Sequence, residues 1–274
     1  MASQLPEQPV GALAKSPEPA QTPNSSTSLL KGKHVSLRPL NITGDIEALY
    51  NSLCGPENDR LWTYMPGGPF PSLATFEQYL DKLSADTFAF TIFTHPPTSP
   101  SSSSEAGIPE NSKVVGITTL MSIVPAHHRI EIGHVIYGEA LKRSTAATEC
   151  VFLLLEHAFG LGYERVEWKC DSLNAPSRSA AGRLGFRAEG VFLRHMIIKG
   201  RRRDTAWFSI MAEEWENWGR QAIHIWLSEE NFNAEGQQKR RLEGIRDGLM
   251  LKVKKEDDIV KEQIQPARDD THEA

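Results

Sequence analysis

The segment from Ala146 to Phe159 constrains the fold more strongly than any other, because its apolar residues recur at the period of an α-helix. These residues are Ala146, Ala147, Cys150, Val151, Leu154, Leu155, Ala158 and Phe159. The spacing predicts an amphipathic helix that buries one face, and Gly160 and Gly162 are expected to end it. Strand-like patterns precede it at 129–137 and follow it at 165–170. A helix between two strands needs a sheet to cover, so an α/β fold is expected.

Further strands and helices are predicted on both sides of this unit. Strands are expected at 35–38, 88–93, 114–120, 186–198 and 204–211, and the last two form a hairpin around Lys199 and Gly200. Helices are expected at 45–53, 72–83 and 174–184, with Thr43 capping the first, Ser72 capping the second and Gly185 closing the third. Strands occur both in runs and in alternation with helices, which favours a single domain with a mixed sheet.

Two segments outside these elements have the composition of disordered chain. Residues 1–32 are rich in Pro, Ser and Gln, and an insertion at about 95–112 is rich in Pro and Ser. Residues 216–274 are expected to form a helical extension, with one helix near 242–253, and a charged tail that frays from about 254. The folded domain is therefore predicted at 33–215.

Composition excludes several classes of protein. Apolar residues make up 39% of the chain, enough for a full core, and the net charge of −5 argues against nucleic acid or an anionic membrane as partner. Three cysteines exclude a disulfide framework and a four-cysteine zinc site. No metal is expected, since the adjacent His127 and His128 would point apart on a strand. No apolar run approaches the ~20 residues of a membrane span and the N-terminus lacks a signal-peptide core, so a cytoplasmic location is expected.

The turn from Leu141 to Glu149 has the features of an anion site. It enters the long helix, whose first amides lack intrahelical partners and carry the positive end of the helix dipole. Lys142 and Arg143 add two cations, and the small residues Ser144, Thr145, Ala146 and Ala147 let a ligand approach the backbone. Such a turn suits a diphosphate. The alternative is a solvated basic turn before a helix capped by Ser144 or Thr145.

A second motif follows the next strand. Asn174 and Ser177 open a short helix that ends in Leu184-Gly185-Phe186. With the strand at 129–137 and the basic turn, this motif resembles the acyl-CoA-binding half of the GNAT superfamily of N-acetyltransferases. The stretches 64–70 and 199–209 are similar to the RimJ/RimL branch, the ribosomal-protein N-terminal acetyltransferases. The resemblance covers about 35–215 and implies a mostly antiparallel central sheet flanked by helices.

The resemblance also implies how acetyl-CoA would bind. The basic turn takes the place of the pyrophosphate loop, with Lys142 at the family's Gln/Arg position, Thr145 at its first Gly and Ala147 at its last. Thr145 would crowd the phosphates if that position needed a positive φ. Val135 and Ile136 would offer backbone groups to the pantetheine arm, and Asn174 would contact CoA or cap its helix.

Three residues are candidates for the chemistry of acetyl transfer. Glu131 is the first candidate for the base, with a solvent-facing strand residue as the alternative. His134 is its rival, but strand alternation places it on the opposite face unless a bulge near Gly133 rotates it. Ser177 is the candidate proton donor to the CoA thiolate, or else a residue of the first helical turn.

The acceptor side is predicted from aromatic residues. By the same resemblance, the loop with Trp62, Tyr64 and Phe70 walls the acceptor site, although these rings could equally cover the sheet. The hairpin turn is followed by Arg201, Arg202 and Arg203. These arginines indicate an exposed turn, a surface that attracts an acidic acceptor, or an RNA contact. The sequence thus predicts an acetyl-CoA-dependent N-acetyltransferase whose acceptor is a protein N-terminus or another primary amine. The alternative is a non-catalytic module that binds acyl-CoA or a protein.

Overall fold

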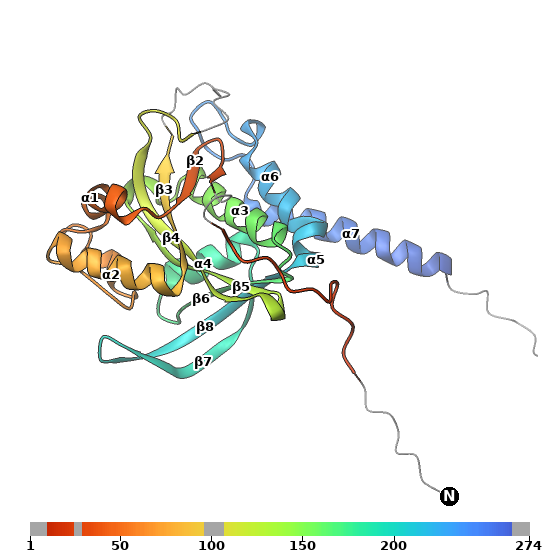
Figure 1. The fold of residues 1–274 in the computed structure, drawn as a ribbon. Coiled ribbons are helices and arrows are strands. Elements are labelled where there is room, and N and C mark those ends of the chain that lie inside the picture. The colour runs from red at the N-terminus through yellow and green to blue at the C-terminus, as the bar shows by residue number, and fades with distance from the viewer. Residues whose placement is uncertain (1–9, 25–28, 96–106, 265–274) are drawn as a thin grey trace, which may run out of the picture.

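A single eight-stranded sheet organises the protein in the computed structural model, which describes residues 10–24, 29–95 and 107–264. The strands are β1 (Leu30–Lys31), β2 (Val35–Pro39), β3 (Phe88–Thr94), β4 (Lys113–Val124), β5 (Arg129–Tyr137), β6 (Arg165–Asp171), β7 (Arg187–Ile198) and β8 (Arg201–Met211). Their order across the sheet is β1-β2-β3-β4-β5-β6-β8-β7 (Figure 1). Among the described strands, β5 and β6 alone pair in parallel, because the long helix crosses over between them. The expected mixed, mostly antiparallel sheet is confirmed.

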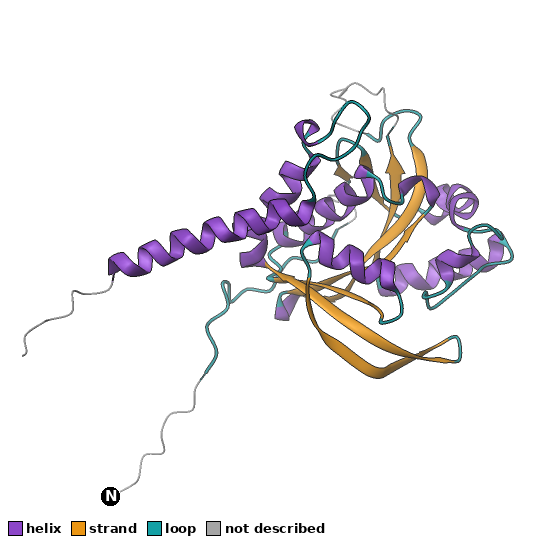
Figure 2. Ribbon diagram, turned by 180° about the vertical axis from the view of Figure 1, so that it is seen from behind, coloured by secondary structure: helices purple, strands orange, loops and turns teal. Residues whose placement is uncertain are grey.

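Helices cover both faces of the sheet (Figure 2). The helices α1 (Ile42–Leu53) and α2 (Leu73–Asp86) pack over one face, which includes the buried Ile117 and Ile136 and is called the α2 face below. The helices α3 (Thr145–Gly160) and α4 (Ala175–Leu184) cover the other, the α3 face, which includes Ile132 and Trp168. The short α5 (Ala212–Glu214), α6 (Arg220–Leu227) and α7 (Leu242–Ile264) extend this layer as the predicted helical extension.

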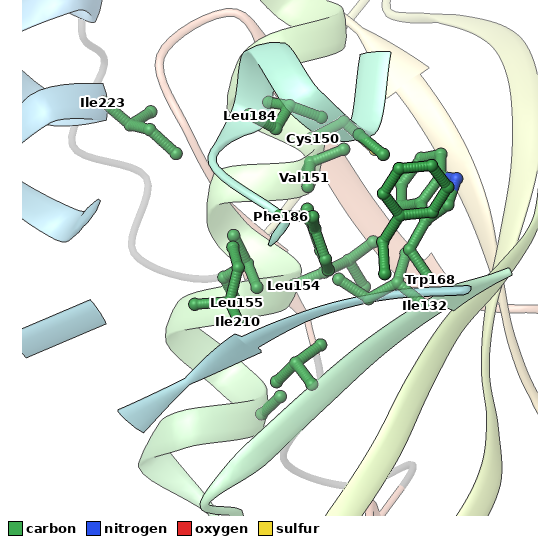
Figure 3. Close-up of a cluster of buried hydrophobic side chains, with 14 of the residues drawn as sticks. Ile132, Cys150, Val151, Leu154, Leu155, Trp168, Leu184, Phe186, Ile210 and Ile223 are labelled. Carbon is green, nitrogen blue, oxygen red and sulfur yellow. The ribbon is translucent and has the colours of Figure 1, made fainter. Parts of the chain in front are cut away.

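The long helix α3 is the centre of the core, as its periodicity predicts. Cys150, Leu154 and Leu155 have no exposed surface, and they pack against Trp168 of β6 and Phe186 (Figure 3). Truncating one such leucine to alanine costs about 3–5 kcal/mol in cores of this kind. The apolar stripe of α3 therefore fixes the helix firmly across the two parallel strands.

Helix caps agree with the sequence except at α1. Asn41, and not Thr43, caps α1: its side chain accepts a hydrogen bond from the Gly44 amide, and Thr43 lies inside the helix. The prediction failed because the helix begins at Ile42, before its first buried residue. Ser72 caps α2, and Gly185 ends α4 with a φ of 102°, as expected.

A buried carboxylate ties the start of β2 to α3. Glu149 accepts hydrogen bonds from the amides of Lys33, His34 and Val35 at 2.8, 2.6 and 3.0 Å. Gly32 is needed beside it, because a Cβ there would lie 2.4 Å from the carboxyl carbon. This contact fixes the N-terminal half of α3, whose first turn carries the predicted anion site.

The N-terminal segment differs from the expectation of a disordered tail over the part that the structure describes. The Lys15 amide donates to Glu164, the Gln21 amide donates to the Leu161 carbonyl at 2.8 Å, and a ring nitrogen of His128 bonds the Glu18 carbonyl. Pro-rich composition disfavours an independent core but does not prevent docking on a neighbouring surface. Within the inserted segment, residues 96–106 lie outside the described residues, as do 1–9 and 265–274, and the domain boundaries remain predictions.

No helix in the described part of the chain has the length and apolar character required to cross a membrane.

Candidate active site

The parallel strands β5 and β6 pair at their first residues and then separate. They pair only at Arg129 with Arg165, Ile130 with Val166, and Glu131 with Glu167. Both strands then continue, β5 to Tyr137 and β6 to Asp171, without pairing to each other. Backbone groups on the facing edges are thereby released from the ladder, and a ligand can take their hydrogen bonds.

A β-bulge in β5 stands at this opening. Thr119 pairs with Gly133 and Ile117 pairs with Ile136, so two residues of β5 face one residue of β4. His134 has a φ of 46° within this bulge. As a result Ile136 joins the cluster of the α2 face, although strict alternation from Glu131 would place it on the other. The structure therefore contains the bulge that was needed to bring His134 to the face of Glu131.

Glu131 lies on the α2 face at the last position where β5 pairs with β6. It is 5% exposed, and its Oε2 atom lies 2.8 Å from both the Ser122 hydroxyl and the Lys169 ammonium. Lys169 also pairs with Glu167 at 2.8 Å. The carboxylate is thus neither solvent-facing nor isolated, because Lys169, whose side chain is 13% exposed, bridges the two strands where they separate.

His134 lies in a less polar environment next to the opening. Its ring centre is 6.1 Å from that of Tyr79 in α2. Burial, together with the positive charge of Arg203, lowers the pKa of His134 to about 4. The imidazole is therefore neutral at pH 7, with one nitrogen able to accept a proton.

The turn before α3 retains free amide donors. Ser144 caps the helix by accepting from the Ala147 amide at 3.1 Å and donating to the Leu141 carbonyl. Among the described residues, none accepts from the amides of Arg143, Thr145 or Ala146. Arg143 has a φ of 55°, whereas Thr145 is helical and needs no positive φ. The turn therefore offers free amides to an anion without a glycine at Thr145. The amides of Lys142, Ser144 and Ala147 are already used, because they donate to the Glu139 carbonyl, the Leu141 carbonyl and the Ser144 hydroxyl.

The two cations of this turn differ in their pairing. The Lys142 ammonium lies 2.9 Å from the Glu139 carboxylate. This contact lowers the pKa of Glu139, and Arg60 makes a smaller contribution. Arg143 is exposed and forms no ion pair with a described residue. Arg143 is thus the cation that is free for a phosphate.

Asn174 and Ser177 lie at the start of α4, on the other side of the opening. The Asn174 side chain accepts from the Ser177 amide at 3.2 Å, which is the capping role foreseen as its alternative. The Ser177 hydroxyl accepts from the indole of Trp168 at 3.0 Å and keeps its own hydrogen to donate. Ser177 also lies near the Cys170 thiol, whose pKa is raised by burial and lowered in part by this hydroxyl.

The predicted aromatic loop meets two other segments near the opening. The Tyr64 hydroxyl donates to the Leu173 carbonyl beside Asn174, and Lys199 of the hairpin turn donates to the Trp62 carbonyl at 2.6 Å. Trp62 itself has no exposed surface, and its ring packs edge-on to Phe70 at 4.8 Å. Tyr64 and Phe70 are half-buried and available to line an acceptor site, whereas Trp62 supports them from behind.

The structure thus brings most of the predicted site to one opening of the sheet, but from two faces. Glu131 and His134 lie on the α2 face, whereas Ser177 belongs to the first turn of α4, which covers the α3 face. Sequence reasoning missed Lys169, Tyr79 and the role of Arg203. The alternation of charged residues along β6, at 165, 167 and 169, was the available signal for a buried ionic row in a central strand.

Comparisons with known proteins agree with this geometry. Residues 34–187 match the family model described as an acetyltransferase (GNAT) domain. A GCN5-related N-acetyltransferase from Brucella melitensis shares 39% identity over 84% of this chain and 98% of its own, with a TM-score of 0.75. A probable acetyltransferase of the GNAT family from Chromobacterium violaceum shares 35% identity over 78% of this chain and 100% of its own, with a TM-score of 0.66.

More distant similarity is confined to the fold. RimJ from Mycobacterium smegmatis, in complex with CoA-disulfide, shares 20% identity over 70% of this chain and 88% of its own, with a TM-score of 0.55. A comparison with curated proteins gave no match. The family model covers more than half of the chain and two structures exceed 30% identity, so the chain belongs to the GNAT acetyltransferase family and is an acyltransferase.

Proposed function

We propose that this protein moves an acetyl group from acetyl-CoA to a primary amine by direct attack of the amine. The observation that carries the proposal is the opening between β5 and β6, with the free amides of the α3 turn nearby and the bulge at His134 on its edge. Acetyl-CoA, when bound, supplies the acetyl group as a thioester.

Acetyl-CoA would be held mainly by backbone groups of the protein. The amides of Arg143, Thr145 and Ala146 would bind the diphosphate, supported by the dipole of α3 and the charge of Arg143. Lys142 and Ser144 would shape this turn, and the Ala147 amide is already bonded to Ser144. Val135 and Ile136 would offer backbone groups to the pantetheine arm from β5, and Asn174 would approach it from α4.

Removal of a proton from the amine falls to Glu131 or His134, directly or through water. An ammonium has no lone pair, and reference pKa values are near 8 for an N-terminal amine and about 10.4 for lysine. Glu131 is held by Lys169 and Ser122, whereas His134 is neutral at pH 7 and weakly basic. We favour Glu131 because these two contacts fix its position at the opening.

On the leaving side, Ser177 would donate its hydroxyl proton to the thiolate and regain one, through water, from the proton that the attacking amine releases. Its oxygen already accepts from Trp168, which orients the hydroxyl hydrogen away from the indole. The acceptor would enter beside Tyr64 and Phe70, and we propose the N-terminus of a protein, whose amine is easier to deprotonate than a lysine side chain.

The test is release of free thiol from acetyl-CoA with a panel of peptides and small amines. Thiol release that requires an amine, with the acetyl group found on that amine by mass spectrometry, is the expected result. Glu131→Gln should lower kcat with little change in the KM for acetyl-CoA. A wild-type pH–rate profile in this variant would transfer the role to His134 or water, with His134→Asn as the paired variant. CoA binding in calorimetry without turnover on any amine would favour the non-catalytic module instead.

A further inference from the structure

The hairpin of β7 and β8 displays two different faces beyond the body of the sheet. Its turn, Lys199-Gly200, has φ values of 48° and 71°, which fixes the register of a two-residue hairpin. Cross-strand partners are Met196 with Arg203, Ile197 with Arg202, and Ile198 with Arg201. Since alternate residues share a face, Arg201 and Arg203 lie on one face and Arg202 lies on the other.

The face of Arg201 and Arg203 is the α2 face, the side of Glu131 and His134. Trp207, which shares their alternation along β8, lies over the Lys169 ammonium at 4.2 Å. Ala206, of the opposite alternation like Arg202, belongs to the core of the α3 face. Both ribbon views show the hairpin tip extending to the side of α1 and α2 (Figures 1 and 2). The contact of Lys199 with the Trp62 carbonyl joins this tip to the aromatic loop.

The arginines of the hairpin tip have no acidic partner among the described residues. Ion pairs of the hairpin are confined to its base, where Glu189 pairs with Arg165 and Arg187 pairs with Glu214. The carboxylate of Asp204, near the tip, accepts from the Arg194 amide. A chain with a net charge of −5 therefore collects uncompensated positive charge in one place.

Arg203 lies two residues beyond Thr205, which pairs with Asp171 at the end of β6. Burial is the main cause of the lowered pKa of His134 and of the raised pKa of Cys170. The charge of Arg203 adds to the first shift and opposes the second, which agrees with this position beside the opening. The Nε atom of Arg203 is buried and has no hydrogen-bond partner. A buried guanidinium donor without a partner costs free energy, which an incoming acceptor group would recover.

We infer that the face of the hairpin carrying Arg201 and Arg203 binds carboxylates of the acceptor, so that the preferred acceptor is a polypeptide with acidic residues directly after its N-terminal amine. This inference rests on the proposed function and names the substrate class for it. Arginine suits the role because its planar fork binds a carboxylate through two hydrogen bonds.

An apolar residue beside the arginines fits a polypeptide acceptor. Met196 pairs with Arg203, shares its face and is 43% exposed, whereas Ile197 pairs with Arg202 and lies on the other face. Aliphatic side chains gain from contact with a polypeptide. Phe192 on the same face is 52% exposed and packs on Trp207 at 4.7 Å, and such rings can also stack on RNA bases, so the experiment includes a polyuridylate arm. The outermost strand β7 also leaves one edge free for a peptide backbone.

The experiment compares two peptides of equal length with free N-termini, one with Glu at positions 2 to 5 and the other with Gln. Wild-type enzyme should show a kcat/KM about tenfold higher for the acidic peptide, since two charge pairs that remain open to solvent contribute roughly a threefold factor each. The preference should disappear in Arg201→Gln/Arg203→Gln through a higher KM. It should persist in Arg202→Gln, the matched control on the other face. Arg201→Gln alone, at an exposed position, serves if the double variant does not fold.

Several outcomes would overturn the inference without touching the proposed function. Equal kcat/KM for both peptides would do so, as would an equal loss in Arg202→Gln. A fall of kcat on the Gln peptide in the double variant would assign Arg203 to the reacting atoms instead of the acceptor. Inhibition by polyuridylate without a preference for acidic peptides would point to RNA. Absence of thiol release with every amine would instead refute the proposed function itself.

Discussion

A glutamate in place of Thr145 should weaken the binding of CoA without lowering the stability of the fold. Thr145 is the first residue of α3, where a glutamate interacts favourably with the helix dipole by about 0.3–1 kcal/mol. The same carboxylate would lie about 6 Å from a bound diphosphate, and at an effective dielectric near 20 the repulsion is roughly 3 kcal/mol per charge pair. Solvent screening at this half-buried position reduces the penalty to about 2 kcal/mol, or roughly a 30-fold weaker affinity.

The assay for Thr145→Glu combines calorimetry with CoA and thermal unfolding without ligand. We expect the Kd for CoA to rise about 30-fold or more, while the unfolding temperature stays equal or increases slightly. Thr145→Gln, of the same shape without the charge, should bind CoA nearly as the wild type does. An unchanged Kd in Thr145→Glu would refute the assignment of this turn to the diphosphate. An equal loss in Thr145→Gln would show that shape, and not charge, governs the site.

Three further predictions concern buried charge. Lys169→Met leaves the carboxylate of Glu131 without its cation, whereas Glu167 keeps Arg165 and Arg129. The variant should be destabilised by about 3 kcal/mol in denaturant unfolding, with Lys169→Arg much closer to wild type. His134 has a pKa of about 4 in the folded protein, below its unfolded value. The free energy of unfolding should therefore fall as pH decreases from 6.5 to 4, by at most roughly 3 kcal/mol. Urea titrations at several pH values measure this slope, and the contribution of this site should be absent in His134→Asn. His128 has a raised pKa, mainly through its hydrogen bond to the Glu164 carboxylate. Its contribution to stability is therefore present below pH 6.5 and is lost as pH rises through the pKa of the folded state. Hydrogen exchange of residues 15–21 should become faster over that pH range, and His128→Gln should remove this pH dependence.

The elements of the fold were largely predictable, because each depends on a local pattern. The helix at α3 followed from its apolar period, and the hairpin followed from the two-residue turn at Lys199 and Gly200. The cap of α1 was missed, since Asn41 and Thr43 are both good capping residues and only the packing of the helix selects one. The docking of residues 15–21 was missed because its hydrogen bonds join segments more than 100 residues apart.

The candidate site was predictable in its residue types but not in its connections. The basic turn was recognisable because a helix start leaves amides unpaired, whatever the rest of the fold. The sequence could not decide whether Ser144 or Thr145 capped α3, and hence which amide the protein uses itself. Tertiary structure also decided that Glu131 pairs with Lys169 across two strands.

By itself, then, the sequence determined the order of strands and helices, the apolar face of α3 and the chemistry available at the turn, since these depend on neighbours a few residues apart. Only the tertiary structure decided which face His134 takes, because the bulge that rotates it comes from the register of β5 against β4. It likewise decided that Arg203 lies near the opening, since that proximity depends on how β8 pairs with β6 and not on the composition of the hairpin.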